Sequence, residues 1–296
     1  MILVAGGTGR LGRRLVADLA DAGEAVRTFS RGISQPIPEE AHDGVERVRG
    51  DLASGTDCER AVDGVRKVVF AASGFGLARG GDPRSVDRDG ALRLTAAAAQ
   101  AGVEHIVMMS MVGAAPDAPL EFLRMKHAAE EAVKTSGVAW TVIRLGASLE
   151  QQLDVLGGAL ASKGIVPVFG SGRADVTFTS TADAAGIVRR ALADPALRNR
   201  SIEWGSETHT FNGLAAALVA RAGRGHVRRI PIAALRAMGA VARPFSPFMA
   251  RMAEAALWMD SGGAAFDVGP TRAEFPDLPI TGLAEVLRAM DPQTAG

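Results

Sequence analysis

Short runs of apolar residues alternate with longer amphipathic segments through the first half of the chain. Most of the runs are continuously apolar, which is typical of strands buried on both faces of a parallel sheet. Apolar residues in the intervening segments recur every three to four positions, which predicts helices. Strands are expected near residues 2–5, 25–29, 45–49, 67–72, 105–110 and 139–145, and helices near 10–22, 56–62, 86–101 and 120–136. This alternation predicts a doubly wound α/β fold around a parallel sheet.

After residue 146 the pattern changes to helices separated by segments that contain Gly and Pro. A helix is expected near 148–162, then a loop with short strands, then a helix that opens with a capping box at Ser180. A short strand over 201–204 is expected to return to the main sheet, and most of 210–290 is expected to be helical. We therefore predict a first domain over 1–147 with 175–205 returning to it, and a smaller, mainly helical lobe of 148–174 and 206–296.

Segment 232–259 is rich in Ala, Met and Arg and is broken by Pro244 and Pro247. It fits a helical cap over the first domain, with adaptable Met side chains near a ligand. The alternative is a helix that binds a membrane surface or a partner protein.

A glycine-rich turn separates the first strand from the first helix. Gly6 permits a sharp turn, Gly9 lets the backbone approach phosphates, and Gly12 lets the helix pack closely on the strand. This arrangement places a pyrophosphate at the N-terminus of the helix. The turn therefore predicts a dinucleotide-binding site, which also includes Thr8, Arg10 and Leu11.

The end of the second strand indicates which dinucleotide is bound. NAD-selective sites usually place an Asp or Glu there, on the ribose 2′-hydroxyl, whereas this chain has Ser30 and Arg31. A guanidinium can hold a 2′-phosphate through two hydrogen bonds, and Ser30 and Arg10 can add to that contact. We expect NADP(H) rather than NAD(H); the alternative is that Arg31 is one solvated arginine among many.

Two further segments complete the predicted cofactor pocket. Asp51 and Leu52 follow the third strand and suit an adenine, with a carboxylate for its amine and an apolar face for its ring. An ordinary helix-capping aspartate is an equal alternative for Asp51. At the end of the fourth strand, Ala71, Ala72 and Ser73 are small enough for the cofactor backbone to pass over them.

Composition narrows the classes of partner. The 33 basic and 33 acidic residues balance, so the net charge provides no field to attract nucleic acid or an anionic membrane. The single Cys58 excludes an internal disulfide and fits a reducing cytoplasm. The first strand leaves no room for a signal peptide, no apolar run is long enough to span a membrane, and no cluster has metal-ligand spacing. We expect a cytoplasmic protein with no metal and with no nucleic-acid or membrane partner.

Several segments together resemble a known family. They include GGTGRLG at the start, FSRG after the second strand, GDL after the third and VVFAASG at the fourth, and matching segments continue to FTSTADAAGIVRRAL. Over roughly residues 1 to 220 the chain resembles the NmrA-like branch of the atypical short-chain dehydrogenase/reductases. The resemblance implies a Rossmann domain with a small substrate domain and a preference for NADP(H). Some members reduce quinones, flavins or phenolic ethers, and others bind the cofactor as a redox sensor.

Typical catalytic members of that superfamily carry Tyr-x-x-x-Lys, in which the tyrosine supplies a proton and the lysine holds the nicotinamide ribose. The corresponding positions in this chain are Phe122 and Lys126, which the i, i+4 spacing places on one helix face. Phe122 cannot donate a proton and the chain contains no tyrosine, so tyrosine-dependent carbonyl reduction is excluded.

Three alternatives remain open for the chemistry. A quinone or flavin can accept hydride and take protons from water. Lys126 can act as general acid or base, with a pKa lowered by desolvation and a neighbouring cation. Alternatively no chemistry occurs, and NADP(H) occupancy controls a partner surface. A solvated helix lysine is the structural alternative for Lys126.

The resemblance also assigns residues around the nicotinamide. Ser110 ends the fifth strand where the family carries a serine, and a structural strand-end serine is its alternative. Leu145 and Gly146 replace the family's Pro-Gly turn, and Gly146 is expected to retain the turn through its conformational freedom. Candidate residues of the substrate pocket are Phe122, Ser148 and Gln151.

We therefore expect an NADPH-dependent oxidoreductase that reduces a small quinone-like, flavin or conjugated aromatic acceptor, with Lys126 and Ser110 as catalytic residues. The alternative is a non-catalytic NADP(H)-binding redox sensor or regulatory protein. We expect a monomer or homodimer with a small-molecule substrate. The resemblance is weakest in the lobe that selects the substrate, so the sequence does not identify that substrate.

Overall fold

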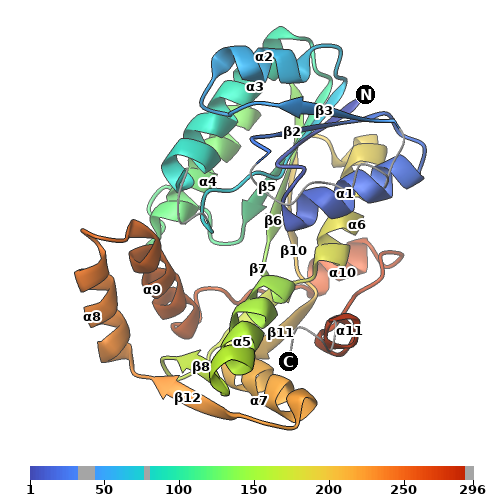
Figure 1. Ribbon diagram of the computed structural model, residues 1–296. Helices are drawn as coiled ribbons and strands as arrows, with labels where there is room; N and C mark the ends of the chain where they lie inside the picture. Colours follow the sequence, from blue (N-terminus) through green and yellow to red (C-terminus); the bar gives the residue numbers. More distant parts are fainter. Residues whose placement is uncertain (33–43, 77–80, 291–296) are drawn as a thin grey trace. The chain divides into compact units, whose positions relative to one another are not determined.

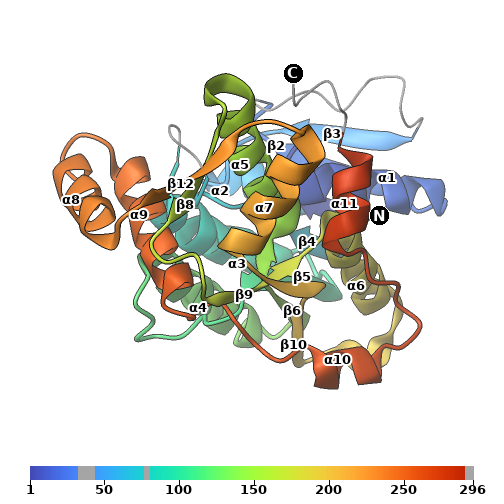
Figure 2. The ribbon, with the colours of Figure 1, turned by 90° about the horizontal axis from the view of Figure 1, so that it is seen from below.

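The computed structural model describes residues 1–32, 44–76 and 81–290, which form two compact units (Figures 1 and 2). The first unit comprises Met1–Arg144 and Ala184–Glu203, and the second comprises Leu145–Asp183 and the chain from Trp204 onward. Residues 175–183, which we expected to return to the first domain, belong to the second unit. The reason is that their strand pairs with other strands of the second unit rather than with the large sheet.

The first unit is built on a seven-stranded sheet in the order β10-β6-β5-β4-β1-β2-β3. Strand β1 pairs in parallel with β2 on one side and with β4 on the other, so the strand order reverses beside β1. The strands are β1 (Ile2–Ala5), β2 (Val26–Ser30), β3 (Val45–Arg49), β4 (Lys67–Phe70), β5 (His105–Met111), β6 (Ala139–Leu145) and β10 (Arg200–Trp204). In an open α/β sheet, ligands bind at the carboxyl ends of the strands where this reversal occurs.

Helices cover both faces of this sheet. Figure 1 shows α2, α3 and α4 on one face and α1 and α6 on the other. The helices are α1 (Arg10–Asp21), α2 (Gly55–Val62), a π-helical segment η1 (Pro83–Gly90) that continues into α3 (Ala91–Gln100), α4 (Glu121–Lys134), α6 (Thr181–Ala193) and a 3₁₀ turn η2 (Pro195–Leu197). The predicted doubly wound fold is confirmed, and the predicted strands occur within two residues of their expected bounds.

The core of the first unit explains why its strands are continuously apolar. Leu3, Val4 and Ala5 are fully buried, because helices pack on both faces of β1. Helix α1 buries Leu15, Val16 and Leu19 on one face. The strands therefore form a buried layer, and the glycine turn directly follows the first strand of that layer.

The second unit contains two small sheets and the remaining helices. In the three-stranded sheet β9 (Asp175–Thr179) lies between β7 (Ala147–Ser148) and β11 (Glu207–Thr210), and β8 (Ile165–Phe169) pairs with β12 (His226–Ile230). Its helices are α5 (Leu149–Lys163), α7 (Phe211–Ala222), α8 (Ile232–Ala242), α9 (Pro247–Asp260), α10 (Gly269–Glu274) and α11 (Leu283–Ala289). Its own core includes Leu153, Val166, Phe178 and Leu214, so this unit buries apolar surface independently of the first.

Candidate functional site

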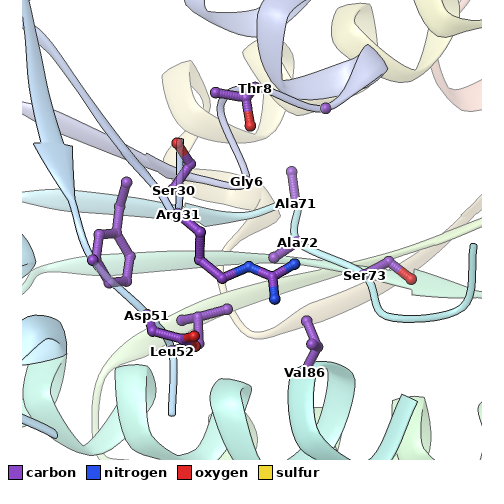
Figure 3. Close-up of a pocket in the computed structure, with 13 residues that line it drawn as sticks. Gly6, Thr8, Ser30, Arg31, Asp51, Leu52, Ala71, Ala72, Ser73 and Val86 are labelled. Carbon is purple, nitrogen blue, oxygen red and sulfur yellow. The ribbon is translucent and has the colours of Figure 1, made fainter. Parts of the chain in front are cut away.

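A pocket lies in the first unit, beside the ends of β1, β2, β3 and β4 (Figure 3). Its lining residues that the sequence had indicated are Gly6, Thr8, Gly9, Ser30, Arg31, Asp51, Leu52, Ala71, Ala72 and Ser73. These residues come from four separate turns, which the parallel pairing brings to one edge of the sheet. The structure therefore gathers most of the predicted cofactor residues in one place.

The glycine turn has the geometry that its three glycines require. Gly6 has a φ of 86°, and a Cβ there would lie 2.7 Å from the backbone nitrogen of Ala72. A Cβ on Gly12 would lie 2.1 Å from the carbonyl oxygen of Gly6, so only glycine lets α1 start so close to β1. Gly9 is the N-cap of α1 and provides no side-chain cap, which leaves N–H groups of the first turn to be satisfied by a ligand or water.

Arg31 reaches into the pocket from the end of β2. In Figure 3 its guanidinium lies between Ala72 on one side and the apolar side chains of Leu52 and Val86 on the other. Ser30 lines the same pocket. The only guanidinium among the lining residues thus lies next to a hydroxyl and two apolar side chains.

Asp51 lies at the pocket edge and does not cap α2. Its Oδ1 accepts a hydrogen bond from the N–H of Ala53 at 2.9 Å. The N-cap of α2 is Ser54, whose hydroxyl oxygen accepts from the N–H of Asp57 at 3.2 Å. The helix-capping alternative for Asp51 is therefore wrong.

Three predicted residues of the glycine turn lie outside the pocket lining, and three residues that were not predicted belong to it. Arg10, Leu11 and Gly12 form the first turn of α1 and do not line the pocket. Phe29, Gly50 and Val86 line it but were not predicted. Gly50 begins the GDL segment that the sequence singled out, and it must be glycine because a Cβ there would lie 2.6 Å from the Phe29 ring.

Lys126 is buried on α4 and holds a fixed position. Only 5% of the residue is exposed, so the solvated-lysine alternative is wrong. Its Nζ donates a hydrogen bond to the carbonyl oxygen of Met109 at 2.9 Å and lies 2.9 Å from Oδ1 of Asp87. The other carboxylate oxygen of Asp87 accepts from the N–H of Gly74 at 2.8 Å. The neighbouring charge is thus an anion, contrary to the cation required by the general acid or base hypothesis.

Sequence reasoning missed Asp87, although a signal for it was present. Asp87 and Leu94 stand seven positions apart, two helical turns, on the buried face of η1 and α3. A carboxylate on an apolar helix face requires a partner, because an unpaired buried charge is costly. Lys126, on the buried face of the adjacent helix, is that partner.

Ser110 belongs to a second buried charged cluster. Its hydroxyl donates to Oε1 of Glu130 at 2.5 Å, and Glu130 is fully buried. Arg144 binds the same carboxylate through two hydrogen bonds, at 2.9 and 2.7 Å. The hydrogen bond to Glu130 raises the pKa of Arg144, so the guanidinium stays charged. The hydroxyl proton of Ser110 is directed into this cluster.

Two phenyl rings lie next to Lys126. The rings of Phe75 and Phe122 have centroids 4.6 Å apart, and Nζ of Lys126 lies 5.6 Å from the Phe122 centroid. Phe75 comes from the segment after β4 and Phe122 from the first turn of α4. An apolar surface therefore occupies the position where the superfamily resemblance places a tyrosine.

The remaining predicted residues, Leu145, Gly146, Ser148 and Gln151, belong to the second unit. Gly146 was expected to retain the turn through its conformational freedom, but its φ is not positive, so it does not use the freedom that is particular to glycine. It is required instead for close approach, because a Cβ there would lie 2.4 Å from the carbonyl oxygen of Thr177 on β9. Ser148 is the N-cap of α5 and accepts from the N–H of Gln151 at 3.4 Å.

Cys58 is buried, and burial raises the pKa of its thiol to about 11, which keeps it protonated at neutral pH. Across 1–32, 44–76 and 81–290, no group of three His, Cys, Asp or Glu side chains could hold a metal ion. Within the same ranges, no helix has the length and apolar character needed to cross a bilayer.

Comparison with known proteins places the chain among nucleotide-binding proteins. The model of an NAD(P)H-binding family matches residues 6–195. An NAD(P)H azoreductase from Xenophilus azovorans is 32% identical over 227 residues, which cover 76% of this chain and 74% of that protein.

Solved structures share the fold. An NADPH-dependent quinone oxidoreductase from Escherichia coli, complexed with NADPH, matches with a TM-score of 0.78 at 22% identity, covering 98% of this chain and all of that one. A nucleoside-diphosphate-sugar epimerase from Staphylococcus aureus matches with a TM-score of 0.79 at 18% identity, covering 97% and 98%. At these identities, the structural matches indicate a common architecture and do not distinguish a reductase from an epimerase.

Proposed function

The chain belongs to the NAD(P)H-binding family, and we propose that it is an NADPH-dependent oxidoreductase acting on a small quinone-like, flavin or conjugated aromatic acceptor. The observation that carries this proposal is the pocket that joins the glycine turn to Arg31 in the first unit. The relative named an NAD(P)H azoreductase supports a conjugated acceptor, because its name describes the reduction of an azo group.

We propose that the pocket holds the adenosine half of NADPH. The N-terminus of α1 would face the pyrophosphate, since Gly9 leaves it without a side-chain cap. Arg31 and Ser30 would hold the 2′-phosphate, and Leu52 and Val86 would contact the adenine ring. Ala71, Ala72 and Ser73 would leave room for the cofactor to run towards Lys126.

NADPH supplies a hydride to an acceptor when it is bound. The task of Lys126 would be to hold the nicotinamide ribose through an ammonium N–H, since the contacts with Met109 and Asp87 leave one of its three donors for a ligand. Asp87 fixes the ammonium group, and Gly74 in turn fixes the carboxylate. These residues would hold the nicotinamide ribose in one position, which would limit the geometries in which the cofactor meets the acceptor.

Among the first-unit residues that we assigned to the chemistry, none is well placed to supply a proton. Phe122 has no proton to give, the Ser110 hydroxyl donates to Glu130, and the remaining N–H of Lys126 is assigned to the nicotinamide ribose. The proposed acceptors therefore fit best if they take a hydride from the cofactor and a proton from water. An azo, quinone or flavin acceptor allows this, because its reduction does not require an acid beside a carbonyl oxygen.

The lack of a well-placed proton donor among these residues also favours one alternative, a redox sensor that binds NADP(H) without turnover. Turnover decides between the two. When NADPH and a quinone, azo dye or flavin are added, the purified protein should oxidise the NADPH. The reaction is measured as a loss of NADPH absorbance. Lys126→Met should reduce kcat by at least about tenfold, because the nicotinamide ribose loses the group that positions it, whereas Lys134→Met, on the same helix, should not. Tight NADPH binding with no oxidation by any acceptor would refute the reductase and support the sensor.

A further inference from the structure

The segment that follows β4 is tied by hydrogen bonds to the pocket and to the surroundings of Lys126. Ser73 lines the pocket (Figure 3), and its hydroxyl oxygen accepts from the N–H of Phe75 at 3.3 Å. The N–H of Gly74 donates to the carboxylate of Asp87, which is the partner of Lys126, at 2.8 Å. The backbone that carries the Phe75 ring is therefore fixed relative to both the pocket and the buried ammonium group.

Phe75 and Phe122 differ in the surface that each ring offers. Their centroids lie 4.6 Å apart with an interplanar angle of 41°, and Nζ of Lys126 lies 5.6 Å from the Phe122 centroid. Phe122 is enclosed, with 9% of the residue exposed, whereas Phe75 is partly exposed. Phe122 therefore supports the neighbouring ring, and Phe75 is the member of the pair that can present aromatic surface to a ligand.

The charged groups beside these rings are already paired. Nζ of Lys126 lies 2.9 Å from one carboxylate oxygen of Asp87, and the other oxygen accepts from Gly74. A ligand rich in hydroxyl groups, such as a sugar, would leave those groups without hydrogen-bond partners against the Phe75 ring, which is unfavourable. A flat conjugated ligand has no such groups to satisfy on its faces.

We propose that Phe75 is a specificity-determining residue whose ring packs against a planar, conjugated ligand. This inference rests on the proposed function, under which that ligand is the acceptor and lies next to the ribose held by Lys126. Aromatic rings in offset or tilted contact gain free energy beyond that of the area they bury. A flat ligand can make this contact over a whole face, whereas a twisted ligand of the same composition cannot.

Equilibrium dialysis of azobenzene-4-carboxylate against the intact protein with NADP⁺ tests the proposal without turnover. The trans isomer is planar and the cis isomer is twisted, so the two differ in shape and not in composition or charge. The parent protein should bind the trans isomer at least about threefold more tightly than the cis isomer. Phe75→Leu keeps an apolar side chain without the ring and should bind both isomers equally. Phe75→Tyr keeps the ring and should retain the preference.

A matched variant and a second ligand separate this contact from general effects. Phe245→Leu makes the same exchange at a phenylalanine of the second unit that is 86% exposed, and it should retain the preference for the trans isomer. Phe75→Leu should bind NADPH and adenosine 2′,5′-bisphosphate as the parent does, because Phe75 does not line the pocket. Unchanged binding of these nucleotides also shows that the variant is folded.

Two results would overturn the proposal. The first is a preference for the trans isomer that is absent from the parent or unchanged in Phe75→Leu. The second is a loss of NADPH affinity by more than about threefold in Phe75→Leu with adenosine 2′,5′-bisphosphate unaffected, which would assign the ring to the nicotinamide.

Failure of the proposed function would give a different result. No acceptor would then oxidise NADPH, while the parent would still prefer the trans isomer and Phe75→Leu would lose that preference. This outcome would support the contact between Phe75 and a planar ligand and would refute the reductase.

Discussion

At the scale of single residues, the ion pair between Lys126 and Asp87 determines where the Lys126 ammonium group lies. Both side chains are almost fully buried, with exposed fractions of 6% and 0%. Burying two charges is unfavourable unless each finds partners, and here the Met109 carbonyl and the Gly74 N–H supply them. The arrangement therefore holds an ammonium group at a fixed point rather than simply stabilising the fold.

Removing one member of this pair should lower the free energy of unfolding. Asp87→Asn leaves the Lys126 charge without its anion, so we expect the free energy of unfolding to fall by about 3 kcal/mol in urea denaturation. The control Asp89→Asn breaks a half-exposed pair with Arg88 and should cost less than about 1 kcal/mol. The double variant Asp87→Asn, Lys126→Met should recover part of the loss. Equal losses in Asp87→Asn and Asp89→Asn would contradict this description of the pair.

At the scale of elements, strand β5 carries a buried histidine at its first position. His105 is 1% exposed, and its Nε2 lies 2.9 Å from Oγ1 of Thr141 on β6. Thr141 donates its own proton to the carbonyl oxygen of Leu197 at 2.8 Å, so His105 must be the donor between the two. The strand pair is therefore joined by a hydrogen bond from the N–H of the buried imidazole.

This histidine should make the stability of the fold depend on pH. Burial lowers the pKa of His105 from 6.5 to about 4, with Arg198 and Lys67 adding to the effect. The unfolded chain takes up a proton below pH 6.5 that the folded chain refuses until about pH 4, so stability falls as the pH drops through that window. The loss should approach about 3 kcal/mol.

Denaturation curves between pH 6.5 and 4 measure this contribution. His105→Gln should lose less stability over the window than the parent protein, whereas His226→Gln, at an exposed histidine of β12, should follow the parent. Parallel curves for the parent and His105→Gln would show that burial of His105 does not carry the effect.

The elements of the first unit were predictable because their periodicity is strong and because glycines mark the tight turns and close approaches between them. The glycine turn, the ends of β2 and β4 and the Phe122–Lys126 spacing all indicated where the pocket and the buried lysine would lie. The pairing of β9 was not predictable, because a five-residue strand carries no information about which sheet it joins. The role of Gly146 also depends on this pairing, since the neighbouring Thr177 lies on β9.

At the scale of the whole molecule, composition conceals the distribution of charge. Equal numbers of basic and acidic residues give the chain no net charge, yet residues 208–253 contain no acidic residue. The two units also differ in what the sequence reveals. The first is recognised from motifs that bind a common cofactor, whereas the second has its own core and provides no comparable motif for a substrate.

The central claim is that the pocket of the first unit binds NADPH and that Arg31 selects it over NADH. Fluorescence titration of both cofactors against the parent protein, Arg31→Ala and the exposed control Arg14→Ala tests this directly. We predict that the parent binds NADPH more tightly than NADH. Arg31→Ala should weaken NADPH binding by about tenfold or more and leave NADH nearly unchanged, because it removes only the contact to the 2′-phosphate. An unchanged dissociation constant for NADPH in Arg31→Ala would contradict the account.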